Sequence, residues 1–288
     1  MESKTGLSDV IPLLRCPICR GSLRREANSL ICENRHCFDI AKSGYVTLTR
    51  ASGSSGDDRE MVRARTAFLD SGYYEKFSDE INKTTAEVLR DGAGDRRDIV
   101  AIDAGCGEGY YADRLSAHLD EVFGKNVTTL GFDLSKYACD HAAKRAKNSG
   151  RGEFFAVSSI YSIPVADECA DVIINLFAPV AEKEFARVLK PGGYLIIGAA
   201  GKRHLYELKR AIYSEAYENE GRRDLPEGFT HISTYTVKYT FDCGERLHEL
   251  FMMTPYYFKT SKEDAAKLDR IDSLDITADF DIYVYRKN

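Results

Sequence analysis

The sequence predicts an α/β protein in which a doubly wound, Rossmann-like, mostly parallel sheet follows a small N-terminal zinc-binding module. Four of the eight cysteines fall between Cys16 and Cys37 and form one local group. A glycine-rich turn follows a buried strand near residue 105. Beyond that turn, strands and helices alternate, which is the pattern of a parallel sheet covered by helices. We therefore expect one metal module and one nucleotide-type domain.

The composition favours a cytoplasmic protein. A chain of 288 residues with 43% hydrophobic side chains can build both cores without disulfides. No stretch approaches the roughly 18 apolar residues of a membrane span, and the first residues do not resemble a secretion signal. Residues 1–65 hold 11 basic and 8 acidic side chains, a net charge of +3, which leaves −8 for the rest, since the total is −5. Only the N-terminal part is mildly suited to phosphate groups.

The N-terminal cysteines have the spacing of a zinc site. Cys16-Pro-Ile-Cys19 is followed by twelve residues and then by Cys32-x-x-x-His36. Each pair can converge on one tetrahedral ion, and thiolate with imidazole is the ligand set that zinc prefers. A filled four-ligand shell leaves no open position, so the site should be structural. Cys37 could replace His36 as the fourth ligand, and the spacing alone does not decide between them.

A linker separates this module from the rest of the chain. Residues 51–58, ASGSSGDD, are polar and rich in Gly and Ser, which predicts a flexible connection. The predicted domains are therefore the module at 1–50, the linker at 51–58 and the main domain at 59–288. Two helices, Arg59–Leu69 and Glu75–Leu89, should precede the main sheet, because apolar residues recur there at helical spacing.

Alternating elements follow. The expected strands are Ile99–Ala104, Thr129–Asp133, Phe154–Val157, Asp171–Phe177 and Tyr194–Ala199, with helices that start at Tyr110, Lys136 and Glu182. A further helix is expected over His204–Tyr217. Two late strands, Ser233–Phe241 and Ile276–Arg286, should pair antiparallel.

The turn after the first main strand has the features of a cofactor loop. Asp103 is followed by Gly105, Gly107 and Gly109, and glycines let the backbone approach a ligand at the start of a helix. A dinucleotide fingerprint needs a third glycine where Tyr110 stands, so NAD is disfavoured. The spacing resembles the first motif of class I S-adenosylmethionine-dependent methyltransferases. The alternative is that these glycines only permit a tight turn.

Two further positions belong to this interpretation. Asp133 ends the next strand, where an acid would accept hydrogen bonds from ribose hydroxyls; otherwise it caps the following helix. At the end of the fourth strand, where related enzymes hold the acceptor base, Phe177 would stack on the base and Asn175 would hydrogen-bond to it. The alternative is a strand end whose phenylalanine belongs to the core.

The two motifs in this order resemble the RlmA (RrmA) family of ribosomal RNA guanine-N1 methyltransferases. Further segments that resemble the family are residues 35–46, residues 64–74 (ARTAFLDSGYY), residues 106–111, Ser158-Ser159, Ala178-Pro179, residues 203–208 and residues 253–255. The resemblance implies methylation of N1 of one guanine in a hairpin loop of 23S rRNA, with S-adenosylmethionine as cofactor. By resemblance alone, a homodimer is expected.

The resemblance also implies site residues. It implies a zinc ligand set of three cysteines and a histidine, which selects Cys16, Cys19, Cys32 and His36 over Cys37. It points to Tyr74, Gly107, Glu108 and His204 as cofactor contacts. The resemblance does not identify the group that takes the proton from N1. It also does not say which guanine of the hairpin is methylated or whether the methylation confers resistance.

Two other functions fit parts of this pattern. A small-molecule methyltransferase with a structural zinc site would share the cofactor loop, because fold does not determine function. The zinc module, which would hold the RNA, is an unusual addition for a small acceptor. A zinc RNA-binding protein without catalytic activity would not need the cofactor loop. We also expect the two modules to fail independently, with cofactor affinity surviving the loss of zinc.

Overall fold

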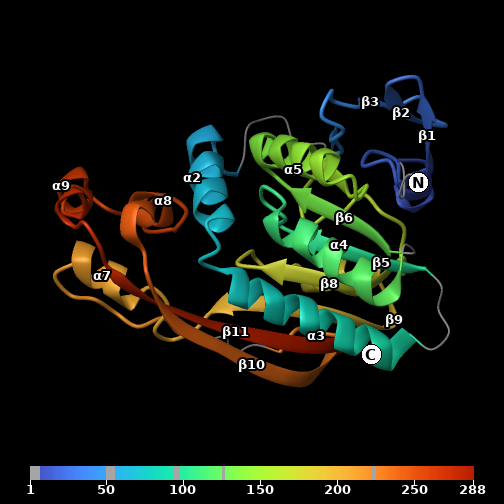
Figure 1. The fold of residues 1–288 in the computed structure, drawn as a ribbon. Helices are drawn as coiled ribbons and strands as arrows, with labels where there is room; N and C mark the ends of the chain where they lie inside the picture. The colour runs from blue at the N-terminus through green and yellow to red at the C-terminus, as the bar shows by residue number, and fades with distance from the viewer. Residues whose placement is uncertain (1–6, 50–55, 94–97, 125–126, 222–224) are drawn as a thin grey trace.

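A computed structural model of the chain describes residues 7–49, 56–93, 98–124, 127–221 and 225–288 (Figure 1). Its centre is an eight-stranded sheet with the order β10-β11-β9-β8-β5-β6-β7-β4. The strands are β4 (Val46–Thr47), β5 (Ile99–Ala104), β6 (Val127–Asp133), β7 (Phe154–Val157), β8 (Ala170–Leu176), β9 (Leu189–Ala200), β10 (Phe229–Asp242) and β11 (Asp275–Lys287). The strands from β4 to β9 run parallel, whereas β11 pairs antiparallel with β9 and β10. The predicted mostly parallel sheet with antiparallel closing strands is confirmed.

Both faces of the sheet are covered, which explains why its central strands are buried and mostly apolar. All six residues of β5 are buried. Ile99 and Ala101 belong to one core cluster, and the intervening Val100 and Ile102 belong to another. Because successive side chains of a strand point to opposite faces, a strand between two cores cannot alternate with polar residues.

Helices form where the apolar periodicity predicts them. They are α2 (Arg59–Asp70), α3 (Glu75–Ala93), α4 (Tyr110–Phe123), α5 (Lys136–Ser149) and α6 (Glu182–Val188). Helices α3 to α6 pack against the sheet, whereas α2 packs against other helices, including α5. Caps define two of their starts: Asp58 accepts hydrogen bonds from the amides of Glu60 and Met61, and Ser135 accepts one from the amide of Ala138. Side chains of α3 and α4 enter the first core cluster, whereas Phe185 of α6 enters the second.

The helix expected over His204–Tyr217 is shorter in the structure. Helix α7 spans Tyr206–Ile212, and the chain then folds back over it. This return places the carbonyl oxygen of Tyr217 and the side chain of Asn219 against the Lys209 ammonium, which donates hydrogen bonds to both. The burial of one charged side chain therefore favours the return over continuation of the helix.

The N-terminal module consists of short elements. These are α1 (Leu7–Val10), the 3-10 turn η1 (Ile11–Leu13) and an antiparallel sheet of β1 (Leu23–Glu26), β2 (Ser29–Cys32) and β3 (Cys37–Asp39). It does not stand apart from the main domain. Strand β4, within residues 1–50, pairs with β7 at the edge of the central sheet. Leu14 and Leu30 lie in the same core cluster as Val100 and Ile102.

Most of the predicted linker, 51–58, lies outside the described residues. Its last residues are held in place. The carbonyl oxygen of Asp57 accepts a hydrogen bond from the Ser135 hydroxyl, and Asp58 caps α2. The chain therefore enters the main domain in contact with α5.

The segment between β10 and β11 adds a cap of short helices. It contains η2 (Gly244–Arg246), α8 (Leu247–Met252), α9 (Lys262–Ala265) and η3 (Leu268–Arg270), and α8 packs against α2 (Figure 1). Within the described part of the chain, no helix combines the length and apolarity that a membrane crossing requires.

The contact between module and main domain can be tested at Arg20. Its guanidinium donates hydrogen bonds to the carbonyl oxygens of Ile163 (3.1 Å) and Val165 (2.9 Å) across the junction. Arg20→Leu should lower the free energy of unfolding by about 1–2 kcal/mol, the lower part of the range for charged hydrogen bonds, because the side chain is partly exposed. Urea titration of the purified protein measures this. Arg24→Leu, which loses only a contact with nearby Glu26, is the control, and equal stability of the two variants would contradict the prediction.

Candidate functional site

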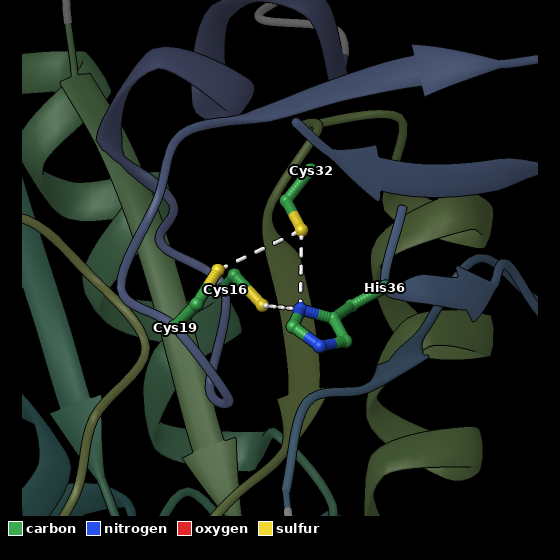
Figure 2. Close-up of side chains that lie close together, drawn as sticks. All are labelled: Cys16, Cys19, Cys32 and His36. Carbon is green, nitrogen blue, oxygen red and sulfur yellow. Dashed lines mark hydrogen bonds between the residues drawn. The ribbon is translucent and has the colours of Figure 1, made fainter. Parts of the chain in front are cut away.

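Four N-terminal side chains converge on one point (Figure 2). The ligand atoms of Cys16, Cys19, Cys32 and His36 all lie within 4.8 Å of one another. Nδ1 of His36 is 3.5 Å from Sγ of Cys16 and 3.3 Å from Sγ of Cys32, and the Sγ atoms of Cys19 and Cys32 are 3.7 Å apart. These separations fit the edges of a tetrahedron around zinc, about 3.5–3.8 Å for zinc–sulfur bonds of about 2.3 Å and a zinc–nitrogen bond of about 2.0 Å.

The surroundings of the cluster act differently on two of its thiols, and burial raises the pKa of Cys16. The backbone amide of Gly21 hydrogen-bonds to Cys19 and lowers the pKa of its thiol to about 6, with a contribution from Asn34. Cys37 is exposed on β3 and lies outside the converging group. The neighbouring His36, just before β3, instead brings Nδ1 to the three cysteines, so these four side chains could hold a zinc ion.

A second site lies at the carboxyl ends of the parallel strands. A cavity of about 920 Å³ opens there, which is ample for a nucleoside-sized ligand and part of an acceptor. Its walls contain Tyr74, Gly105, Gly107, Glu108, Asp133, Phe177 and His204, all of them predicted from the sequence. The segment between β10 and β11 contributes further lining residues to the cavity: Thr254, Tyr256, Phe258 and Lys259.

The glycines of the turn are required by their backbone and their neighbours. Gly105, Gly107 and Gly109 have φ angles of 90°, 53° and 86°, which residues other than glycine rarely adopt. A Cβ on Gly105 would lie 2.7 Å from Cβ of Ala178, and one on Gly109 would lie 2.8 Å from Cβ of Ala142. Gly105 and Gly107 line the cavity, whereas Gly109 packs against α5 behind it.

Three carboxyl groups surround this turn. Asp133 accepts hydrogen bonds from the amides of Gly107 (3.0 Å) and Ser135 (2.7 Å), so it supports the turn and also begins α5. Asp103 lies behind the turn and Glu108 lines the cavity, and each has a buried oxygen without a hydrogen-bond partner among the described residues. Burial raises the pKa of all three carboxyl groups, and the neighbouring Asp133 and Glu108 raise that of Asp103 further.

Tyr74 and His204 meet across the cavity wall. The Tyr74 hydroxyl is 3.3 Å from Nε2 of His204, and the Asp279 amide donates to Nδ1 at 3.3 Å. Burial, together with the nearby charge of Lys209, lowers the pKa of His204 to about 3, so the imidazole is neutral at physiological pH. The sequence alone gave no reason to pair a residue at position 74 with one at 204.

The two residues predicted to face the substrate lie in different surroundings. The Phe177 ring lines the cavity, is 48% exposed and follows β8 with a φ angle of 56°. Such a backbone conformation costs on the order of 1 kcal/mol for a bulky residue and is common at functional sites. Asn175 is fully buried, and its amide donates to the carbonyl oxygens of Ala104 and Pro179. It therefore supports the turn that carries Phe177.

Sequence reasoning missed several cavity residues. Arg65 of α2 forms an ion pair with Asp57 and lies next to Gly107. It stands within the ARTAFLDSGYY segment, which was a usable signal. Tyr161, Phe258 and Asn219 also line the cavity, but none of them belongs to a motif or a periodic pattern.

The donor set fits S-adenosylmethionine better than a dinucleotide. This cofactor presents ribose hydroxyls and an ammonium as donors, and the carboxyl groups of Asp133 and Glu108, which line the cavity, can accept from such groups. A pyrophosphate would instead bring negative charges next to three carboxyl groups. The glycine turn would let either ligand approach the backbone. The acids are therefore what favours S-adenosylmethionine over a dinucleotide.

Two family profiles match the regions of the chain that contain the zinc cluster and the glycine turn. Residues 14–50 match a family profile described as "RlmA, N-terminal", and residues 95–252 match one described as a methyltransferase domain. The chain is 34% identical over 206 residues to the 23S rRNA (guanine(748)-N(1))-methyltransferase of Streptomyces fradiae, with 71% of this chain and 69% of that protein covered. It is 36% identical over 215 residues to a putative 23S rRNA (guanine-N(1)-)-methyltransferase of Micromonospora griseorubida, with 69% and 70% covered.

Two more distant matches are a relative that aligns with nearly the whole chain and a solved structure. A putative 23S rRNA (guanine-N(1)-)-methyltransferase of Bacillus subtilis is 29% identical over 287 residues, 96% of this chain and 97% of that protein. Among solved structures, a putative methyltransferase of Bacillus halodurans covers 70% of this chain with 14% identity and a TM-score of 0.45. The chain belongs to the RlmA family of S-adenosylmethionine-dependent 23S rRNA (guanine-N1)-methyltransferases.

Proposed function

We propose that this protein transfers the methyl group of S-adenosylmethionine to N1 of a guanine in a hairpin loop of 23S rRNA. The observation that carries the proposal is the mouth of the cavity, where Tyr161, Phe177 and Phe258 are 61%, 48% and 70% exposed. Proteins that read unpaired RNA stack its bases on such aromatic side chains. A small-molecule enzyme would bury these rings around its acceptor, so this rim favours RNA.

The cofactor would occupy the side of the cavity next to the glycine turn. Asp133 would accept hydrogen bonds from the ribose hydroxyls, and Glu108, which lines the cavity 3.7 Å from the Arg145 guanidinium, would accept from donors of the cofactor. When bound, S-adenosylmethionine supplies a methyl group on a sulfonium, which is an excellent leaving group. The chain's contribution is then to align the acceptor and to exclude water.

The acceptor guanine would enter beside Phe177. A base in a hairpin is stacked or paired and has to be extruded before its N1 reaches the methyl group. Phe177, held outward by the support of Asn175, would stack on the extruded base. Guanine N1 carries a proton at neutral pH, so the site must also favour its loss during transfer.

The N-terminal module would hold the RNA beside the cavity. Its zinc ligands form a closed shell, so the metal would act through structure and not through chemistry. Because the module shares a core with the main domain, it would present the RNA in a defined orientation. The proposed activity implies a cytoplasmic protein, where ribosomal RNA is found. The homodimer implied by the family resemblance remains a prediction.

The proposed activity predicts a specific block to reverse transcription. Purified protein with S-adenosylmethionine should create one strong stop on unmodified 23S rRNA, because N1 methylation prevents Watson–Crick pairing. A short RNA with the hairpin should be methylated far more efficiently than free guanosine, since the rim and the module contact RNA beyond the base. Equal methylation of guanosine and hairpin would favour the small-molecule alternative.

The cofactor site predicts the effect of one acid. Asp133→Ala should weaken S-adenosylhomocysteine binding by about 1–3 kcal/mol, roughly 5–150-fold, as hydrogen bonds to a carboxylate are lost. Calorimetry measures this, and the wild-type protein should not bind NAD detectably. Asp140→Ala is the control. Asp140 lies in α5, the helix that follows Asp133, and outside the cavity, so this variant should bind normally. Unchanged affinity in Asp133→Ala would mean that the acid only supports the turn and begins α5.

The geometry of the zinc cluster predicts that substitutions of His36 and of Cys37 affect zinc binding differently. Metal analysis should find one zinc per chain, which Cys37→Ser retains and His36→Ala loses. Because the module and the main domain share a core, loss of zinc should also lower the melting temperature of the main transition, by about 2–4 °C for each kcal/mol lost. Zinc retention by His36→Ala together with loss in Cys37→Ser would overturn the ligand assignment.

A further inference from the structure

A second cavity lies between the zinc module and the main domain. It has a volume of about 690 Å³, and none of the residues around it lines the cofactor cavity. Three arginines face two carboxylates in it, which leaves a net positive charge. The lining residues on which the argument depends are Arg15 and Arg20 of the module, and Ser162, Asp167, Glu184 and Arg187 of the main domain.

Two of these arginines are held on the same backbone oxygens. Arg20 donates to the carbonyl oxygens of Ile163 and Val165 at 3.1 and 2.9 Å. Arg187 donates to the same two oxygens at 2.9 and 3.0 Å. Two guanidinium groups therefore lie next to each other, although like charges repel. Carbonyl oxygens carry no net charge, so only an anion can balance this pair.

The two acids of the pocket differ in how firmly they are placed. Glu184 is 15% exposed and pairs with Arg187 at 2.6 Å, so this arginine has a fixed partner. Asp167 lies 2.6 Å from Arg187 and 3.7 Å from Arg20, but its side chain is 71% exposed. Ion pairs of such exposed carboxylates contribute little to stability. A ligand with more negative charge and more oxygens can therefore take the place of Asp167.

Arg15 brings the charge that neither acid balances. Its Nη1 donates to the carbonyl oxygens of Pro12 (2.9 Å) and Leu14 (2.8 Å), which holds the side chain in place. With the described residues, Arg15 forms no ion pair, and its Nε and Nη2 form no hydrogen bond. These two nitrogens present parallel donors, which is the geometry that binds two oxygens of one phosphate.

The zinc-binding turn positions two of the arginines. Arg15 directly precedes the ligand Cys16, and Arg20 directly follows the ligand Cys19. The Arg15 amide donates to the carbonyl oxygen of Pro164 at 2.8 Å, and the Arg20 amide donates to that of Cys16 at 2.8 Å. The pocket therefore forms only where the module docks on the main domain.

Two segments connect this pocket to the cofactor cavity. Tyr161 lies at the rim of the cavity, and the next residue, Ser162, lines the pocket. Val180 lines the cavity just before α6, and Glu184 in the first turn of that helix lines the pocket. An RNA strand whose base enters the cavity beside Tyr161 carries its flanking phosphates toward the arginines.

We propose that this pocket, lined by Arg15, Arg20 and Arg187, binds a backbone phosphate of the RNA strand that carries the target guanine. The inference rests on the proposed function and deepens it. The phosphate would accept hydrogen bonds from Nε and Nη2 of Arg15 and would replace Asp167 beside the other two arginines. Phosphate contacts fix the position of a strand and carry no base specificity, so the three arginines are positioning residues.

The first arm of the test measures the affinity for the hairpin RNA at several salt concentrations by fluorescence anisotropy. Arg15→Met keeps the length of the side chain and should weaken binding by about 10-fold. The slope of log K against log salt should fall by about 1, because one phosphate contact is lost. Arg15→Lys keeps the charge and should retain most of the slope, although an ammonium cannot offer two parallel donors. Arg24→Met removes the same charge from the module outside the pocket and should weaken binding by less than about 3-fold.

The second arm should move affinity in the opposite direction. Asp167→Asn removes the carboxylate that competes with the phosphate and should tighten RNA binding by about 3-fold or more. Glu168→Gln is the matched control, because Glu168 pairs with Lys287 at 3.4 Å and does not line the pocket. It removes the same charge one residue away and should have a smaller effect.

The two arms together separate a phosphate site from a structural cluster. If the arginines only join the module to the main domain, Asp167→Asn loses an ion pair and gains no affinity for RNA. Unchanged or weaker binding by Asp167→Asn would therefore overturn the inference, as would wild-type affinity in Arg15→Met. Asp167→Asn tests the pocket even if Arg15→Met folds poorly.

A failure of this pocket is distinguishable from a failure of the proposed function. The anisotropy assay measures binding with S-adenosylhomocysteine present and needs no methyl transfer. If the wild-type protein methylates the hairpin and both variants bind it as the wild type does, only the phosphate site is wrong. If the wild-type protein does not bind the hairpin, the proposed function fails, and this inference fails with it.

Discussion

The tight approach of the glycine turn to its neighbours is the constraint on which the functional cavity depends. Gly105 leaves no room for a Cβ against Ala178, and Gly109 leaves none against Ala142. This close packing brings the end of β5 against β8 and α5 at once. It places the carboxyl groups of Asp103, Glu108 and Asp133 around one turn, and it opens the cavity at the ends of the parallel strands. A larger residue at either glycine would displace all of these groups together.

The cavity walls combine groups of different charge. Buried acids surround the turn, whereas Tyr74 and His204 share a hydrogen bond in the wall, and the buried Lys209 ammonium donates to Asn219, another residue of the wall. Isolated buried charges are costly, and a ligand that supplies the complementary groups offsets that cost. The same argument explains why burial raises the pKa of the acids and keeps His204 neutral.

The zinc module is bound into the main domain more closely than its sequence indicates. Cysteine spacing and the Gly/Ser-rich segment predicted a separate unit that would fail independently. In the structure, β4 pairs with β7, Leu14 and Leu30 enter the core of the main sheet, and Arg20 donates to two carbonyl oxygens across the junction. Contacts of this kind transmit strain, so loss of zinc should be felt in the main domain. The coupling also gives the module a defined position from which to present RNA.

The sequence by itself determined the alternation of strands and helices, the glycine turn and the zinc ligand types, because local spacing and residue chemistry carry that information. The spacing alone left Cys37 open beside His36, although the family resemblance selected His36, and the expected helix over His204–Tyr217 was too long. The structure brings His36 to the three cysteines, ends α7 at Ile212 and buries Asn175 under the turn that carries Phe177. It also joined Tyr74 to His204, and Lys209 to Asn219 and the cavity. Residues 130 positions apart can share a hydrogen bond only after the sheet and its cap have formed, and no local pattern records which of them will meet.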